Sequence, residues 1–257
     1  MPRTNPIVQK DMTLEQLEMG LSPKEKEFFE RVTAGGYDPV YFAEVLLGVP
    51  THPKQKLWLW LTTKTQKEKA FQLGLQLLCW KTRPEFDARF LNHDFLKNIL
   101  VPSNRWGKTL ITSIKHLWYL YYKVGVRGNP DHRLEERCVT FNLSPLSNHC
   151  DAGYQYIIDI LSSQFIWIDE NGKSFKNVCL IGDHEDNLMG PFLVAAQQQK
   201  RVLKFANNTN YKAVPTGEDQ ASSLAGTPYL YISYDECAQS LHLKAELPAK
   251  IMSRLID

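Results

Sequence analysis

The sequence predicts an α/β fold in which a mainly parallel sheet is flanked by helices. Three short runs, at 98–101, 137–144 and 229–234, have the length and apolar content of buried strands. Stretches with helical periodicity separate these runs along the chain. Because strands that alternate with helices favour parallel pairing, we expect ligand sites at the carboxyl ends of the strands.

The overall composition is that of a globular protein that can bury a core. The chain has 257 residues, of which 43% are hydrophobic, enough for one large α/β domain. The formal net charge of +2 gives no argument for or against a nucleic-acid partner. The cysteines are scattered, without the paired spacing of a zinc site or a disulfide framework. No apolar leader or bilayer-length stretch is visible, so we expect a soluble intracellular protein.

Residues 1–50 are predicted to form an N-terminal helical region. The segment Ser22–Glu25 combines a capping serine, a proline at the first helical position and a glutamate at the third. This capping box predicts a helix that begins here, and the pair Gly35–Gly36 is expected to end it. Asp38–Pro39 then predicts the start of a second helix.

Residues 51–257 are predicted to form one domain with a helical insertion, or lid, near 62–95. In that segment lysines stand between apolar positions, as in amphipathic helices that turn a charged face to solvent. A helical stretch over 108–123 follows the first strand. After the second strand we expect a helix opened by Pro145, an ambiguous apolar run at 178–182, a hairpin of 201–206 and 211–214, and the last strand.

The segment VPSNRWGKTL at 101–110 predicts a phosphate-binding loop. Such a loop turns backbone N–H groups toward phosphate oxygens at a helix N-terminus, where the helix dipole favours anions. Gly107 would allow close approach, Lys108 would bind the β- and γ-phosphates, and Thr109 would offer its hydroxyl to Mg²⁺. Pro102 stands in place of the usual first glycine; it suits a tight turn but donates no N–H. The alternative is an ordinary strand-to-helix turn with a solvated lysine.

The run YLYISY at 229–234 is followed by two carboxylates. In a nucleotide hydrolase of this layout, Asp235 would hold Mg²⁺ and Glu236 would orient and deprotonate the attacking water. The alternative is a strand that ends in two solvated acidic residues. The length of chain between Lys108 and Asp235 suits a P-loop NTPase of the RecA-like type that has an additional strand and a catalytic glutamate. Together the two motifs predict nucleotide hydrolysis.

Four stretches carry the residue patterns of one known family. The loop at 104–109 reads NRWGKT, residues 52–55 read HPKQ, and residues 229–238 read YLYISYDECA. Residues 141–154 read FNLSPLSNHCDAGY. These resemble, respectively, the deviant Walker A motif, the adenine-binding motif, the Walker B region and the strand-helix segment after the Walker A helix of phage terminase large subunits. Those proteins are the ATP-driven motors that pump viral DNA into empty capsids.

The resemblance runs from about residue 40 to the end of the sequence, and implies ATP and Mg²⁺ as ligands. A glutamine reads the base in this family, which would assign that role to Gln55. Arg105 would stabilise charge on the γ-phosphate, as a catalytic arginine does. The implied catalytic residues are Glu236, Lys108 and Arg105; the metal-binding residues are Thr109 and Asp235; the nucleotide-binding residues are Gln55, Ser103, Asn104, Arg105, Trp106, Gly107, Lys108 and Thr109.

The resemblance also implies partners and a location. The family translocates double-stranded DNA into a procapsid, as a homo-oligomeric ring on the capsid portal and together with a small terminase subunit. This assembly works in the cytoplasm of the host cell and needs no membrane. A neighbouring subunit supplies an arginine to each site, and the candidates here are Arg137, Arg201 and Arg254.

Two features depart from the terminase pattern. Terminase large subunits continue after Walker B into a coupling motif and a nuclease domain, and neither is recognisable in the remaining residues. We therefore expect a motor domain without nuclease activity, either excised from a longer protein or accompanied by a separate nuclease. The segment between Gln55 and the loop is also long for the family, which is why we predict an insertion there.

Other functions stay open. The motor core of a helicase also pairs a base-reading glutamine with a strand that ends in Asp-Glu, but it needs a second similar domain. A non-hydrolysing scaffold would bind a nucleotide only to order an assembly. A sequence-specific DNA-binding module would need a recognition helix or a finger, and no such signature is visible. The acidic cluster at 183–186 is expected to be a loop, because no partner metal ligands are visible.

Overall fold

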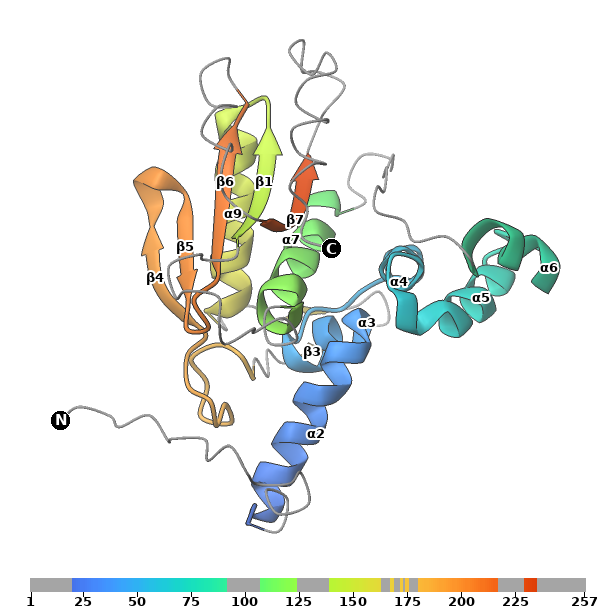
Figure 1. Cartoon of the computed structure of the whole chain (residues 1–257), viewed down its shortest axis with the longest axis horizontal. Coiled ribbons are helices and arrows are strands. Elements are labelled where there is room, and N and C mark those ends of the chain that lie inside the picture. Colours follow the sequence, from blue (N-terminus) through green and yellow to red (C-terminus); the bar gives the residue numbers. More distant parts are fainter. Residues whose placement is uncertain are drawn as a thin grey trace, which may run out of the picture.

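The protein is built on a five-stranded mixed sheet, with helices packed against it and a group of helices to one side (Figure 1). The structure, a computed structural model, describes residues 20–91, 107–123, 139–162, 167–168, 172, 174–175, 180–216 and 229–234. Within these ranges, no helix combines the length and the apolar character needed to cross a membrane.

The first described helix, α2 (Pro23–Tyr37), begins at the predicted capping box. The backbone N–H of Ser22 donates to Oε2 of Glu25 at 2.7 Å, and the N–H of Glu25 donates to Oγ of Ser22 at 3.3 Å. The prediction of a helix start here is therefore confirmed. The expected second helix follows after Asp38 as two short segments, α3 (Pro39–Tyr41) and a π-helix (Phe42–Leu46).

The prediction that Gly35–Gly36 ends the first helix is wrong, because α2 continues through both glycines. Gly35 is buried, and a Cβ at this position would collide with the hydroxyl of Tyr122 and with a methyl group of Leu46. The missing side chain therefore serves close packing. The helix ends one residue after Gly36, where Asp38 adopts an extended conformation and caps the next helix.

We call residues 53–91 the helical arm; it extends to one side of the sheet in Figure 1. The arm has a small hydrophobic core of its own, in which the rings of Trp80 and Phe86 lie 4.9 Å apart. The helices predicted over this part of the chain are confirmed for its described residues. They are α4 (Pro53–Leu61), a 3-10 helix (Lys64–Gln66), α5 (Lys67–Gln76), α6 (Arg83–Phe86) and a π-helix (Asp87–Leu91).

The sheet has the strand order β4-β5-β6-β1-β7. β1 pairs in parallel with β6 on one side and with β7 on the other, whereas β4–β5 and β5–β6 are antiparallel. Two short strands, β2 (Trp167–Ile168) and β3 (Ser174–Phe175), form a separate antiparallel pair. The strands of the main sheet are β1 (Val139–Ser144), β4 (Leu193–Gln197), β5 (Val202–Phe205), β6 (Asn210–Pro215) and β7 (Tyr229–Tyr234).

The prediction of a mainly parallel sheet is wrong, because the sheet is mixed. The predicted hairpin is present as β5 and β6, with Asn208 in the left-handed conformation at the turn. β6 then pairs in parallel with β1, so the hairpin extends the sheet, and β4 adds a further antiparallel strand. Turn residues indicate a hairpin locally, but they do not indicate the sheet that it joins.

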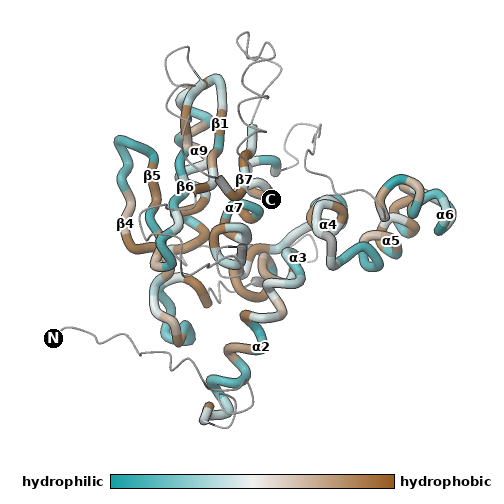
Figure 2. Tube along the Cα trace, viewed as in Figure 1, coloured by the Kyte–Doolittle hydropathy of each residue, from teal (hydrophilic) through white to brown (hydrophobic). Residues whose placement is uncertain are grey.

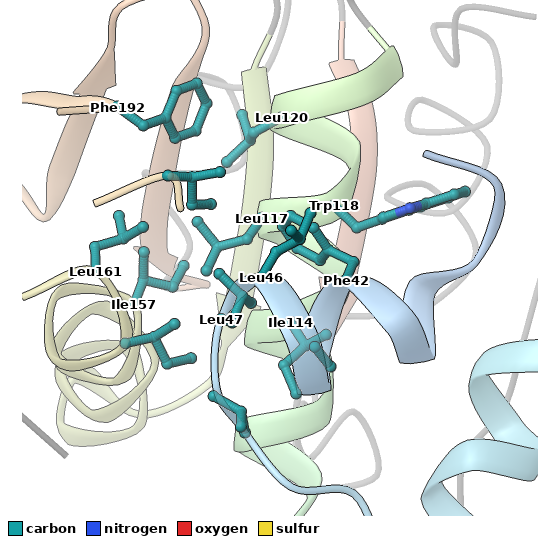
Figure 3. Close-up of a cluster of buried hydrophobic side chains, with 14 of the residues drawn as sticks. Phe42, Leu46, Leu47, Ile114, Leu117, Trp118, Leu120, Ile157, Leu161 and Phe192 are labelled. Carbon is teal, nitrogen blue, oxygen red and sulfur yellow. The ribbon is translucent and has the colours of Figure 1, made fainter. Parts of the chain in front are cut away.

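Two helices, α7 (Lys108–Trp118) and α9 (Ser147–Leu161), pack beside each other and against the sheet. α7 continues as a π-helix at Tyr119–Lys123. Figure 3 shows side chains from both helices meeting those of the π-helix at Phe42–Leu46. The described part of the N-terminal region therefore shares one hydrophobic core with the sheet and its covering helices. Members of this core include Phe42, Leu46, Ile114, Leu117, Ile157, Leu161 and Phe192.

Polarity follows this layering in most places. Figure 2 shows hydrophilic residues on α6 and at the turn between β4 and β5, and hydrophobic residues where α7 and α9 meet the sheet. β1 is an exception, because it is buried at all six positions although Thr140, Asn142 and Ser144 are polar. A row of polar side chains thus lies inside the protein.

Two other predicted segments are only partly visible. The described part of the ambiguous run, 180–182, forms a turn and a bend. The strand predicted at 98–101 lies outside the described residues.

Candidate functional site

The candidate site begins at the N-terminus of α7. Gly107 has φ 82° and ψ 36°, a left-handed conformation that favours glycine, and Lys108 is the first helical residue after it. Thr109 follows in the first turn of α7, so its side chain and that of Lys108 project from the positive end of a helix dipole. The turn-to-helix geometry that the sequence predicts after Gly107 is present. Residues 103–106, including Arg105, lie outside the described residues.

Gln55 lies against this turn. It is 4% exposed at the third position of α4, and a Cβ at position 107 would come within 2.7 Å of its Nε2. Its Oε1 accepts the backbone N–H of His52 at 3.1 Å, which fixes the side chain at the start of α4. The fold thus brings the HPKQ segment to the glycine of the predicted loop. Base reading by Gln55 stays a prediction, and its amide oxygen already serves the helix cap.

The segment that leads into α4 is held by Glu44. The carboxylate oxygen Oε1 of Glu44 accepts the backbone N–H of Thr51 at 3.1 Å and its hydroxyl at 2.7 Å. Lys56 pairs with the same oxygen at 2.9 Å, with both side chains partly shielded from water. A carboxylate with three donors fixes the start of α4, and with it Gln55, relative to the N-terminal helices.

β7 runs antiparallel to α7. His116 of α7 lies 2.7 Å from the hydroxyl of Ser233, and Tyr119, further along the helix, stacks on Tyr231, earlier in the strand, with ring centroids 5.0 Å apart. Because the two contacts occur in opposite order along the two elements, the N-terminus of α7 and the carboxyl end of β7 lie at the same edge of the sheet. Lys108 and Tyr234 mark those two ends.

The carboxyl ends of the neighbouring strands lie at the same edge. Thr216, directly after β6, donates its backbone N–H to the carbonyl of Ser144 at the end of β1, at 2.8 Å. Its hydroxyl lies 2.8 Å from that of Tyr234, the last residue of β7. Three parallel strands therefore finish level with one another, as expected of a site at the carboxyl edge of a sheet. Asp235 and Glu236 come next in the sequence and lie outside the described residues.

One of the three candidate arginines is already in an ion pair within the chain. Arg201, left-handed at the turn between β4 and β5, contacts Asp151 of α9 through its Nε at 2.5 Å and also contacts the hydroxyl of Ser147. This hydrogen bond lowers the pKa of the Asp151 carboxyl and raises the pKa of Arg201. Arg137 and Arg254 lie outside the described residues.

The donors present at this edge fit a metal–nucleotide ligand only in part. Lys108 and Thr109 supply a cation and a hydroxyl at a helix N-terminus, which suits phosphate and Mg²⁺. In the part of the chain that the structure describes, no group of three His, Cys, Asp or Glu side chains could hold a metal. In the acidic cluster at 183–186, Asp186 pairs with Lys24 of α2 at 3.6 Å and its N–H donates to His184.

A set of buried polar residues near this edge was not predicted from the sequence. His116, Asn142 and Ser233 are 1%, 6% and 7% exposed and hydrogen-bonded to one another. Each stands in a segment that reads as an apolar helix or strand. The available signal was the alternation in VTFNLS of β1, because polar residues at every second position of a central strand must lie inside.

Comparison with known proteins does not assign a family. Neither a protein-family model, nor a curated protein, nor a solved structure matches this chain.

Proposed function

We propose that this protein is a Mg²⁺-dependent P-loop ATPase. One observation carries the proposal: α7 and β7 run antiparallel, so that Lys108 begins its helix at the sheet edge where β7 ends, directly before Asp235 in the sequence. A phosphate loop and an acidic strand end at one edge form the layout of a nucleotide hydrolase. Helices that cover parallel strands generally run antiparallel to them, so the motif residues brought to this edge, Lys108 and Thr109, favour a phosphate loop over an ordinary turn.

The residues have distinct roles in this proposal. The N-terminus of α7 and the Lys108 ammonium bind the β- and γ-phosphates, and Thr109 and Asp235 hold Mg²⁺, which neutralises charge on the phosphoryl oxygens. Glu236 orients the attacking water and accepts its proton. Arg105 stabilises charge on the transferring phosphoryl group. Gln55 lies against the turn at Gly107 and is the candidate for contact with adenine.

The biological task that we propose for this ATPase is translocation of double-stranded DNA into a viral procapsid. This step rests on the resemblance of NRWGKT and YDEC to the motifs of phage terminase large subunits. The resemblance brings with it a homo-oligomeric ring, the capsid portal and a small terminase subunit as partners, in the host cytoplasm.

The test separates nucleotide binding from hydrolysis. Lys108→Ala should abolish ATP binding, because the cation on the phosphates is lost, whereas Glu236→Ala should keep binding and lose hydrolysis. The dissociation constant for ATP and the rate of phosphate release are measured for each variant, with and without Mg²⁺ and double-stranded DNA. Lys26→Ala is the matched control, since Lys26 is an exposed lysine on α2. A parent protein that binds ATP but never hydrolyses it, with DNA and in every assembly state, would instead be a nucleotide-ordered scaffold.

A further inference from the structure

A directed chain of hydrogen bonds joins α7 to two strands inside the protein. The hydroxyl of Ser233 donates to Oδ1 of Asn142 at 2.9 Å, so the hydroxyl hydrogen is already used. The contact of 2.7 Å between Ser233 and His116 is therefore made by Nε2–H of the imidazole, which donates to the serine oxygen. Burial lowers the pKa of His116 to about 3, which keeps the imidazole neutral with a single N–H.

The chain of hydrogen bonds connects three elements of the fold and lies against a fourth. Asn142 and Ser233 are direct partners in the parallel pairing of β1 with β7. The amide of Asn142 also lies against Gly153 of α9, where a Cβ would collide with its Nδ2. The hydrogen bonds thus link α7, β7 and β1 at one level of the sheet, and Asn142 packs closely against α9. All three polar side chains are buried.

Buried hydrogen bonds fix the relative position of two elements more strictly than apolar packing does. Apolar contacts between a helix and a strand are non-directional, so they specify the relative position of the two elements only through the fit of their side chains. A buried hydrogen-bond chain instead fixes one arrangement, because an unmade bond in the core costs the desolvation of its donor or acceptor. Tyr119 stacks on Tyr231 beside this contact and provides aromatic packing between the helix and the strand. The contribution of His116 and Ser233 is therefore chiefly to fix the position of α7 relative to β7.

The elements fixed in this way are the two that carry the proposed chemistry. His116 stands eight residues after Lys108, which corresponds to about 12 Å along a helix. Ser233 stands on β7 one residue before Tyr234, the last residue of the strand. A shift of α7 along β7 would therefore change the distance between the phosphate-binding residues and the end of the acidic strand by the same amount.

We propose that His116, Ser233 and Asn142 are positioning residues for ATP hydrolysis, which set the distance between Lys108 with Thr109 on α7 and the carboxyl end of β7, directly before Asp235 in the sequence. This inference rests on the proposed ATPase function. The three residues touch neither the nucleotide nor the attacking water. Their effect is on the alignment of groups that do, and misplacement by about 1 Å can lower a rate by up to about 100-fold.

The test compares turnover with binding. Ser233→Ala should lower kcat for ATP by about 10- to 100-fold, while the dissociation constant for ATP changes less than about 2-fold, because α7 keeps its own phosphate-binding residues. Ser233→Thr, which keeps the hydroxyl, should restore kcat to within about 3-fold of the parent. The matched control is Thr140→Val, which removes a buried hydroxyl from the same row on β1 that has no hydrogen-bond partner among the described residues. This control should keep the parental kcat.

The kcat values of these variants either support the inference or overturn it. A loss of kcat in Ser233→Ala with rescue by Ser233→Thr supports the inference, whereas parental kcat in Ser233→Ala, or an equal loss in Thr140→Val, overturns it. If Ser233→Ala fails to fold, Ser233→Cys, which keeps a weaker donor of similar size, should give an intermediate kcat, and a parental value would overturn the inference. A parent protein that does not bind ATP at all removes the proposed function itself, which is a distinct result.

Discussion

At the scale of single residues, polar side chains are buried in the core of this protein, and His116 is the clearest case. His116 is fully buried between α7 and the sheet, and its ring meets that of Tyr211 edge-on with centroids 5.1 Å apart and that of Tyr231 at 4.7 Å. Ser233 accepts the hydrogen of Nε2, whereas Nδ1 has no hydrogen-bond partner among the described residues. A neutral imidazole is the form that this environment stabilises, because protonation would bury a charge.

The buried imidazole makes the stability of the protein depend on pH. The pKa of His116 is about 3 in the folded protein, below its ordinary value of 6.5, so the unfolded chain binds a proton first as the pH falls. The free energy of unfolding should therefore decrease below about pH 6, by up to about 1.4 kcal/mol for each pH unit. His116→Gln keeps a hydrogen-bond donor but cannot be protonated in this pH range. The part of the decrease in unfolding free energy that comes from His116 should therefore be absent in this variant.

The measurement is urea unfolding of the parent and of His116→Gln at pH 7, 6 and 5. The difference between the two proteins isolates His116, because the remaining histidines and carboxylates titrate equally in both. A difference in unfolding free energy that stays constant over this range would contradict a buried neutral imidazole.

At the scale of elements, the carboxylate of Asp38 joins the helical arm to the N-terminal helices, in addition to the pair of Glu44 with Lys56. Asp38 is 7% exposed; its Oδ1 accepts the indole N–H of Trp60 at 2.8 Å and the backbone N–H of Val40 at 2.9 Å. Its Oδ2 pairs with Lys69 of α5 at 2.6 Å, but the side chain of Lys69 is 53% exposed. The buried hydrogen bonds should therefore matter more than the ion pair.

Two substitutions distinguish these contributions. Asp38→Ala removes a helix cap and leaves the partly buried indole N–H of Trp60 without its acceptor, so it should lower the free energy of unfolding by about 1–3 kcal/mol. Lys69→Ala removes only the exposed partner and should cost less than about 1 kcal/mol. Chemical denaturation measures both, and Asp186→Ala, which breaks the exposed pair with Lys24, serves as the control. Equal losses in Asp38→Ala and Lys69→Ala would show that the ion pair dominates.

The elements that the sequence predicts well are those whose signals are local. The capping box at Ser22–Glu25, the hairpin turn at Asn207–Asn208 and the helix after Gly107 all depend on residues within a few positions of one another. The end of α2 depends instead on Tyr122, far away in the sequence, which packs against Gly35 and makes the glycine part of the helix. Local rules for helix ends therefore fail there.

The topology of the sheet and the geometry of the candidate site also depend on residues far apart in the sequence, so local sequence patterns predict them poorly. Nothing near β6 indicates that it pairs in parallel with β1, so the mixed order of the sheet was missed. The start of a helix at Lys108 was predictable from the motif, but the approach of Gln55 to Gly107 follows only from the resemblance and the folded chain. Only the polar alternation in VTFNLS of β1 hinted at buried polar residues; the hydrogen bonds among His116, Ser233 and Asn142 were not predictable, because they join three segments far apart in the sequence.

At the scale of the whole molecule, the proposed motor would depend on neighbouring subunits for full activity, because a ring is part of the proposal. A catalytic arginine supplied in trans raises the rate of phosphoryl transfer by about 10³–10⁵-fold in P-loop enzymes that use one. The isolated chain should therefore hydrolyse ATP well below the typical enzyme rate of about 10 s⁻¹. Turnover per chain should rise with protein concentration when double-stranded DNA is present, as rings assemble. A monomer that reaches about 10 s⁻¹ without DNA would contradict this dependence.

Among the candidate arginines, Arg201 can be assigned a role by a matched pair of variants. Its guanidinium is held by Asp151 and Ser147 at the start of α9, so we expect Arg201 to stabilise its own chain and not to act on a neighbour. Arg201→Ala and Asp151→Ala should then lower the melting temperature to a similar small extent, as for an exposed pair, and both should keep the concentration-dependent rise in turnover. If only Arg201→Ala loses that rise, Arg201 leaves Asp151 on assembly and completes the site of the next subunit. If both variants keep it, the arginine that acts in trans is Arg137, Arg254 or another residue.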